Sequence, residues 1–412
     1  MTRSLALAAL ASLALGCGSS DDELAKLGPL PIYPVPGCEA LDHRPCDIGT
    51  SPCRERLMEL AACLRGSEPL PVPPIATMTT AEFAAYLNER FAEDPPPEPN
   101  HYETALTLLG LVEPGGLGRQ AMVEDDLEFV WGIYRFATKD IIIVDHGVPA
   151  DGPDPNSVLL HEFVHALQDA DVDLLRFYDE YSTSYDSYLA VAAVSEGEAF
   201  FHQSRFWSSL LGLDPGKVDW SQRLQERVEF AEETALQAPS PYTASYALFP
   251  YDFGARFVHH AWVASGSAGV DALFASPPTR SVAVMASETG LESAAWPSPE
   301  FPTLDAPAPW TPWTEASLGA WGSLLYLTGL TTHAPARDAA LDLVGDRLLV
   351  YTATETSTET AAVWHLEFGS EETAATVEGL VRGERGAVAR AGNRVVLVVS
   401  TGTDPLDWAL AP

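Results

Sequence analysis

The chain has 412 residues, and its 58 acidic side chains against 23 basic ones give a formal net charge of −35 at pH 7. Such an excess of negative charge repels phosphate groups, so nucleic acid and anionic membrane surfaces are excluded as expected partners. The length is sufficient for two or three domains.

Residues 1–16 are typical of a bacterial lipoprotein signal peptide. Arg3 supplies the positive start, an apolar stretch follows, and the ending Ala14-Leu15-Gly16-Cys17 resembles a lipobox. We therefore expect an exported protein, anchored to the cell envelope, in the outer membrane, by a lipid on Cys17. The alternative is an ordinary secretory peptide without lipid attachment. No later stretch reaches the roughly 18 uninterrupted apolar residues that a membrane span requires.

Residues 17–74 are rich in proline, glycine and polar residues, which predicts a lipidated tether with a small stapled segment and a helix over 54–64. Beyond Cys17, four cysteines remain, an even number in an oxidising compartment: Cys38, Cys46, Cys53 and Cys63. Two disulfides of open connectivity are expected. A four-cysteine zinc site is the alternative, but it would need paired spacings of two to four residues, and these are wider.

Residues 75–298 contain the longest helical patterns and are predicted to form one helix-rich domain. Within it, the β-branched run from Asp140 to Asp145 predicts a strand. The edge of such a strand is able to bind an extended peptide by backbone hydrogen bonds. Asp154-Pro155 then predicts a helix start, with Asp154 as the N-cap and a wide apolar face following it.

This helix carries the pentapeptide His161-Glu162-Phe163-Val164-His165. Two histidines four residues apart lie on the same helix face and are able to share one metal ion. Zinc is commonly held by such imidazoles with one further protein ligand, and the glutamate between them is placed to accept a proton from water. The alternative is a buried helix with two unrelated histidines.

The predicted third ligand is Glu196, in the sequence Ser195-Glu196-Gly197-Glu198-Ala199 of the next helical segment. Glu198 lies about 200° around the helix from Glu196 and is unable to share its role. Asp171 is the other alternative, but the continuing helix carries it away from the metal, because no glycine turn follows the second histidine.

These two motifs resemble the gluzincin branch of zincin metallopeptidases, in which a glutamate of a Glu-Gly-x-Ala sequence on a second helix follows the two histidines. The resemblance implies a zincin-like domain over 75–298 and one zinc ion bound by His161, His165 and Glu196. Glu162 would be its general base. Gly197 would let the second helix approach the first. From about Tyr102 onward, the chain also resembles poorly characterised bacterial envelope proteins that are presumed metallopeptidases.

Several further residues are candidates for supporting roles. Tyr251 matches the tyrosine or histidine that stabilises the oxyanion in gluzincins, or it is a packed aromatic. Asp169 would orient a ligand, or it is a plain acid at a helix end. We expect His259 and His260 to be structural, with one of them lining the cleft as the alternative. We expect His146 to lie in a loop.

Residues 299–313 are rich in proline and are predicted to be a linker, and residues 314–412 are predicted to form a small α+β domain. Its predicted helices span 318–327, 335–343 and 371–382, and its predicted strands span 347–351, 363–368 and 394–399. The expected fold class of the whole chain is therefore α+β, a helix-rich zincin-like domain with a short sheet followed by this smaller domain.

The leading hypothesis from the sequence is a zinc-dependent metallopeptidase that acts on a peptide or protein substrate at the cell envelope. A surface lipoprotein that keeps the zincin fold only for binding is the main alternative. Glu162 argues against it, because a structural site needs no base in that position. A metal hydrolase of a non-peptide bond is a third possibility.

Overall fold

The computed structural model describes residues 30–93, 97–287, 299–301, 304, 306–354, 357–382, 386–402 and 407–410. The predicted signal peptide and the lipid attachment at Cys17 lie outside the described residues. Among the helices in these ranges, none combines the length and the apolar character that crossing a bilayer would require.

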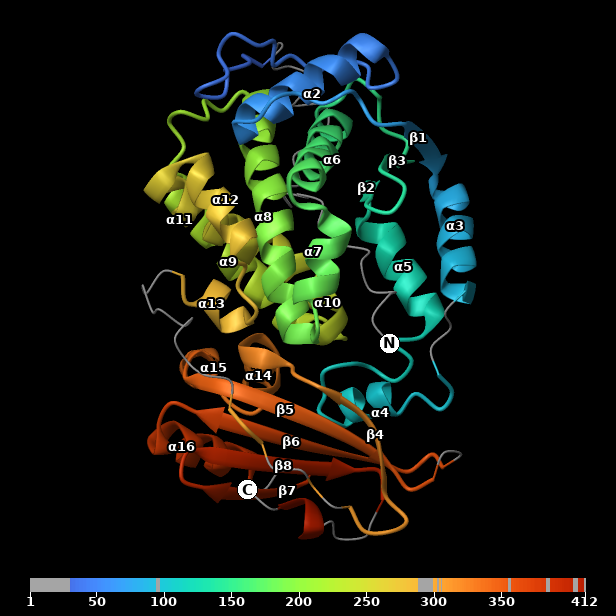
Figure 1. The fold of residues 1–412 in the computed structure, drawn as a ribbon, viewed down its shortest axis with the longest axis vertical. Coiled ribbons are helices and arrows are strands. Elements are labelled where there is room, and N and C mark those ends of the chain that lie inside the picture. The colour runs from blue at the N-terminus through green and yellow to red at the C-terminus, as the bar shows by residue number, and fades with distance from the viewer. Residues whose placement is uncertain are drawn as a thin grey trace.

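The fold is α+β, as expected, with a helical part that carries a three-stranded sheet and a C-terminal part built on a five-stranded sheet (Figure 1). The helices of the first part are α2 (Ser51–Arg65), α3 (Thr80–Glu93), α4 (His101–Leu108), α5 (Arg119–Phe129), α6 (Pro153–Val172), α7 (Leu174–Tyr181), α8 (Tyr185–Leu210), α9 (Trp220–Gln237), α10 (Pro241–Leu248), α11 (Gly254–Ser265), α12 (Ser267–Ala275) and α13 (Ser281–Met285).

Helices α6 and α8 form the centre of the helical part, and almost every residue of α8 is buried. A helix that is covered on all sides needs no polar face, which explains the apolar run from Leu189 to Val194. The N-cap of α6 is Gly152 and not Asp154, which lies inside the first turn. The prediction of Asp154 as N-cap was wrong because Pro153 fits the first helical position one residue earlier than Asp154.

The three-stranded sheet has the order β1-β3-β2, formed by Ile75–Thr79, Asp140–Asp145 and Gly132–Arg135 respectively. The predicted strand β3 is thus the central strand, parallel to β1 and antiparallel to β2. We expected β3 to bind substrate at a free edge of the sheet. That expectation was wrong, because β3 is hydrogen-bonded to β1 on one side and to β2 on the other. The strand with an open edge beside α6 is β2.

Residues 17–74 were predicted to be a tether with a small stapled helix, and the helix is present as α2; the described part, residues 30–74, is packed on the helical part instead of forming a free tether. Val35 is fully buried, the backbone N–H of Cys46 donates to Asn156 of α6 at 3.0 Å, and α2 packs along α6. The two expected disulfides are present as Cys38–Cys63 and Cys46–Cys53. These pairings leave no free thiolate for the alternative zinc site among the four cysteines.

The C-terminal sheet is antiparallel throughout, with the order β4-β5-β6-β8-β7. Its strands are β4 (Thr311–Ala316), β5 (Leu343–Thr352), β6 (Thr360–Phe368), β7 (Ala387–Ala391) and β8 (Arg394–Ser400), and its helices are α14 (Gly319–Thr328), α15 (His333–Leu341), α16 (Glu371–Val381) and the 3₁₀ turn η3 (Asp407–Leu410). The three predicted strands and three predicted helices are confirmed. Two edge strands were not predicted, and β4 begins inside the segment predicted to be a linker.

Candidate metal centre

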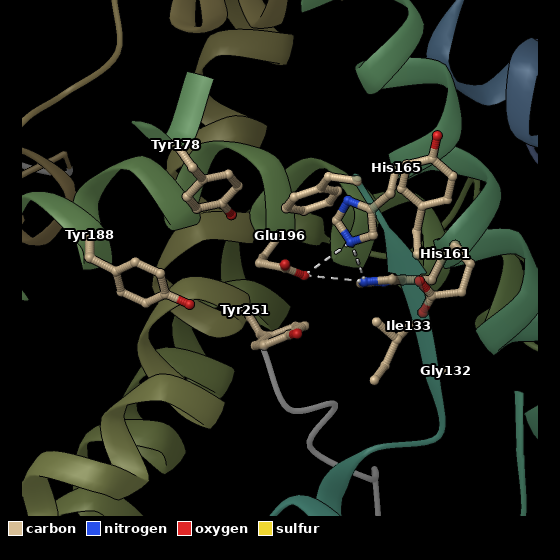
Figure 2. A pocket seen from close by; sticks show the side chains of 11 residues that line it. Gly132, Ile133, His161, His165, Tyr178, Tyr188, Glu196 and Tyr251 are labelled. Carbon is tan, nitrogen blue, oxygen red and sulfur yellow. Dashed lines mark hydrogen bonds and ion pairs between the residues drawn. The ribbon is translucent and has the colours of Figure 1, made fainter. Parts of the chain in front are cut away.

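The three predicted ligands lie together between α6 and α8. His161 and His165 project from successive turns of α6, and Glu196 faces them from α8 (Figure 2). The Nε2 atoms of the histidines are 3.0 Å apart, and they lie 3.3 Å and 3.1 Å from Oε2 of Glu196. Three ligand atoms of a tetrahedral zinc site are separated by about 3.3 Å. Among the described residues, this group therefore has the dimensions of a zinc site.

Gln168 fixes the tautomer of His165. Its amide nitrogen donates to the carbonyl oxygen of Ser195 and to Oε2 of Glu198, both at 2.9 Å, and neither of these atoms is a donor. The amide oxygen therefore faces Nδ1 of His165, 2.9 Å away, and Nδ1 must carry the proton. The lone pair of His165 Nε2 is then directed at the centre of the group.

Gln203 has the same relation to His161. Its amide oxygen lies 3.0 Å from Nδ1 of His161, and its amide nitrogen reaches Oγ of Ser157 at 3.5 Å. Sequence reasoning missed both glutamines. The only signal for Gln203 is its spacing of seven residues from Glu196, which places both side chains on one face of α8.

The resulting donor set fits a cation. Two Nε2 atoms and a carboxylate oxygen converge at a buried point, so a proton or a metal ion must lie between them. Burial alone lowers the pKa of His165, but the Glu196 carboxylate outweighs it and raises that pKa to about 9. Burial likewise raises the pKa of Glu196, yet the two histidines hold it well below its usual range. A shared proton thus marks the position where a metal ion would bind.

Glu162 lies against strand β2, next to the metal ligands. A Cβ atom on Gly132 would lie 2.8 Å from Oε1 of Glu162 and 2.7 Å from Val158, so only glycine lets the strand approach α6 this closely. The backbone of Tyr134 in the same strand hydrogen-bonds the carboxylate. Burial raises the pKa of Glu162 to about 8, which makes it a stronger proton acceptor than an exposed glutamate.

Tyr251 lies on the other side of the ligands, in the π-helical turn η1 (Phe249–Phe253) between α10 and α11. Such single turns are frequent at functional sites. Its ring stacks on that of His161, with centroids 5.9 Å apart, and it hydrogen-bonds Glu196. Burial, followed by the charge of Glu196, raises the pKa of Tyr251 well above its usual value, so the hydroxyl keeps its proton.

A close helix crossing holds Tyr251 in this position. A Cβ on Gly197 of α8 would overlap the backbone of Gly254, the first residue of α11, and a Cβ on Gly254 would overlap the carbonyl of Ala193. Gly197 was expected to bring α8 close to α6. That expectation is corrected, because the helix it admits is α11, together with the turn that carries Tyr251.

The ligands face a pocket whose other walls are mostly aromatic. Its remaining lining residues are Gly132, Ile133, Tyr134, Phe136, Glu162, Tyr178, Tyr188 and Tyr251. Figure 2 shows Tyr178 and Tyr188 beyond Glu196, on the side away from β2. The hydroxyl of Tyr178 is 2.6 Å from Ser195 Oγ, which fixes its ring at the rim. Neither tyrosine was predicted from the sequence.

The two alternative third ligands lie away from the ligand group. Asp171 is half-exposed and forms an ion pair with Arg65 of α2. Glu198 is buried, with its carboxylate 3.2 Å from Nε of Arg65 and 2.9 Å from the amide nitrogen of Gln168. Neither carboxylate belongs to the described metal-ligand group, as expected for Glu198 from the helix repeat and for Asp171 from the continuing helix.

Asp169 does not orient a ligand histidine, which corrects the expected role. Its carboxylate accepts hydrogen bonds from the hydroxyl of Tyr134 at 2.8 Å and from the backbone of Leu174 at 2.9 Å, and it pairs with Lys139 at 3.0 Å. Asp169 therefore joins α6 to strand β2 and to the start of α7. The side chain that contacts His165 is that of Gln168, one residue before Asp169.

The remaining histidine candidates lie outside the pocket lining. His259 is buried on α11 with its ring 5.4 Å from that of Phe201, in agreement with a structural role. His260 follows it on α11 and does not line the pocket. His146 hydrogen-bonds the carbonyl of Val130 at 3.0 Å and stacks on Trp131, as a loop residue would.

Comparisons of this chain with protein-family models, with curated proteins and with solved structures give no match.

Proposed function

We propose that this protein is a zinc-dependent metallopeptidase of the gluzincin type, and that it hydrolyses peptide bonds in a peptide or protein substrate. The observation that carries the proposal is the convergence of three metal-ligating side chains, His161, His165 and Glu196, beside the buried carboxyl group of Glu162. A structural zinc site normally closes its fourth position with another protein ligand. Here the group opens onto a pocket instead.

The residues around the ligands suit the proton transfers of peptide hydrolysis. A bound zinc ion would supply Lewis-acid activation of water. Glu162 accepts the proton of the attacking water and delivers it to the leaving amine, a role that its raised pKa favours. Tyr251 remains protonated and donates its hydroxyl hydrogen to the oxygen that becomes negative during attack.

Strand β2 offers a means to hold the substrate. No strand in the described part of the chain pairs with its outer edge, and its residues Gly132, Ile133 and Tyr134 line the pocket beside Glu162. An extended peptide would add to this edge by backbone hydrogen bonds, which bind without regard to sequence. Selectivity would then come from the aromatic walls. Since histidine is the only basic residue type in the described pocket lining, we expect apolar side chains to be preferred over acidic ones.

The test is a zinc-dependent cleavage profile of the mature protein on a diverse peptide library. We expect cleavage next to apolar residues, loss of cleavage when a chelator removes the metal, and recovery on addition of one equivalent of zinc. Total zinc content is measured in parallel. If zinc is bound stoichiometrically and no peptide is cleaved, the non-catalytic binding lipoprotein becomes the better proposal.

We also propose that lipid attachment at Cys17 anchors the protein in the cell envelope, from the lipobox-like sequence Ala14-Leu15-Gly16-Cys17. Cys17→Ser should move the protein from the membrane fraction to the soluble fraction, because one anchoring signal is removed and the negative charge of the chain adds no attraction to anionic lipid. Fractionation after a high-salt wash measures this. A Cys17→Ser protein that still sediments with membranes would contradict lipid anchoring.

A further inference from the structure

A chain of buried polar side chains connects the disulfide-bonded N-terminal segment to the metal centre. Arg65, the last residue of α2, is 4% exposed, and its Nε lies 3.2 Å from the carboxylate of Glu198. Glu198 accepts the amide nitrogen of Gln168 at 2.9 Å, and the amide oxygen of Gln168 lies 2.9 Å from Nδ1 of His165. Three contacts therefore separate Arg65 from a proposed zinc ligand.

The direction of each hydrogen bond in this chain is set by chemistry. A guanidinium group only donates, and a carboxylate only accepts. Glu198 therefore faces the NH₂ group of Gln168, as does the backbone carbonyl of Ser195 at 2.9 Å, and these two acceptors together turn the amide oxygen toward His165 and keep the proton of that ring on Nδ1. If the amide turned round, its NH₂ group would face Nδ1 and the ring proton would move to Nε2. A protonated Nε2 is unable to bind a metal ion.

The N-terminal segment fixes the turn of helix that carries Arg65. The disulfide Cys38–Cys63 fixes the last turn of α2, and Gly66 ends the helix in a left-handed conformation with a φ of 80°. Asp171 forms an ion pair with the same guanidinium. On α8 the imidazole of His202 also lies 3.9 Å from Glu198, but burial lowers the pKa of His202 well below its usual value and keeps the ring neutral, so Arg65 is the cation of the described contacts to Glu198.

We propose that Arg65 is a positioning residue that sets the zinc affinity of the centre through Glu198 and Gln168, so that the segment 30–74 is a working part of the metal site. The proposal rests on the zinc site proposed above. Removing an outer partner of a metal ligand typically weakens metal binding by about tenfold to a hundredfold. We expect replacement of Arg65 to weaken zinc binding by the same factor, although Arg65 is nearly 100 positions before His161, the first ligand in the chain.

The test compares Arg65→Met with Arg56→Met. Arg56 lies on the same helix and pairs with Asp42 at 2.9 Å, so its replacement also removes a charge from the segment but leaves Glu198 untouched. Zinc affinity is measured by competition with a chromophoric chelator. We expect about a tenfold to hundredfold weaker affinity for Arg65→Met and no change for Arg56→Met. Arg65→Lys, which restores a donor to Glu198, should recover part of the loss.

A second comparison asks whether Arg65 acts through Gln168. In a Gln168→Met background the path to His165 is already broken, so adding Arg65→Met should weaken zinc binding no further. The visible spectrum of the cobalt-substituted protein reports on the ligand geometry and should change in Arg65→Met but not in Arg56→Met. Additive losses of affinity, or an unchanged cobalt spectrum, would contradict the positioning role.

Two further outcomes keep the proposal distinct from the function on which it rests. If the wild type binds no zinc, the metal site itself is wrong. If the wild type binds zinc and a correctly folded Arg65→Met protein binds it equally well, only the role of Arg65 is wrong. Should Arg65→Met fail to fold, the isosteric Glu198→Gln takes its place, because it removes the charged one of the two acceptors that orient Gln168 and leaves only the carbonyl of Ser195. Unchanged zinc affinity would then refute the proposal.

Discussion

Replacing Glu162 with glutamine should lower the rate of peptide cleavage by about a hundredfold to ten-thousandfold while zinc remains bound. The amide keeps the shape of the side chain beside Gly132, so α6 and strand β2 stay in place. The amide is unable to accept the proton of the attacking water. The other carboxylate in the described pocket lining is Glu196, which is a proposed metal ligand and is not free to replace Glu162. Steady-state kinetics and metal analysis of the same preparation measure both quantities.

Tyr251→Phe is the matched comparison for that variant. It removes one hydrogen-bond donor to the developing oxyanion and leaves the ring stacked on His161, so we expect a smaller loss, of no more than about a hundredfold. Undiminished cleavage by Glu162→Gln would refute the proposed mechanism and leave the metal site standing. A larger loss of rate in Tyr251→Phe than in Glu162→Gln would contradict the assignment of Glu162 as the proton acceptor and of Tyr251 as the oxyanion donor.

Glu196→Ala should abolish stoichiometric zinc binding, because it removes one of three protein ligands and leaves two histidines only. Glu198→Ala is the control two residues away on the same helix. It breaks the link between Arg65 and Gln168, so we expect weaker affinity, by about tenfold to a hundredfold, but one bound zinc when the ion is in excess. Metal analysis at fixed excess zinc separates the two. Equal zinc retention by both variants would overturn the ligand assignment.

The parts of this site that the sequence predicted are those set by local geometry. The spacing of His161 and His165 places them on one face of any helix, and the same repeat separates Glu196 from Glu198 on the next. Likewise, the strands and helices of the C-terminal part follow from their apolar patterns. The edge strand β7 was missed, since only two of its five residues, Ala387–Ala391, are even half-buried, so the pattern shows no apolar face.

The parts that the sequence did not predict depend on contacts between distant segments. Gln168 and Gln203 are ordinary helix residues until two helices bring them against the ligand histidines. Arg65 lies more than a hundred residues from Gln168 in the chain. The segment around Arg65 is rich in proline and glycine, a composition that predicted a tether. The disulfides and the packing of Val35 convert that segment into a scaffold, and neither effect has a periodic signal.

The contact between Gly197 and Gly254 restricts how this protein can diverge. A methyl group at Gly197 would overlap the backbone of Gly254, and one at Gly254 would overlap the backbone of Ala193, so a side chain at either glycine separates α8 from α11. Divergence should therefore preserve the two positions as a pair, although 57 residues of chain separate them. A relative that keeps both histidines and Glu196 but bears larger side chains at this crossing would have to supply the hydroxyl of Tyr251 from a different element.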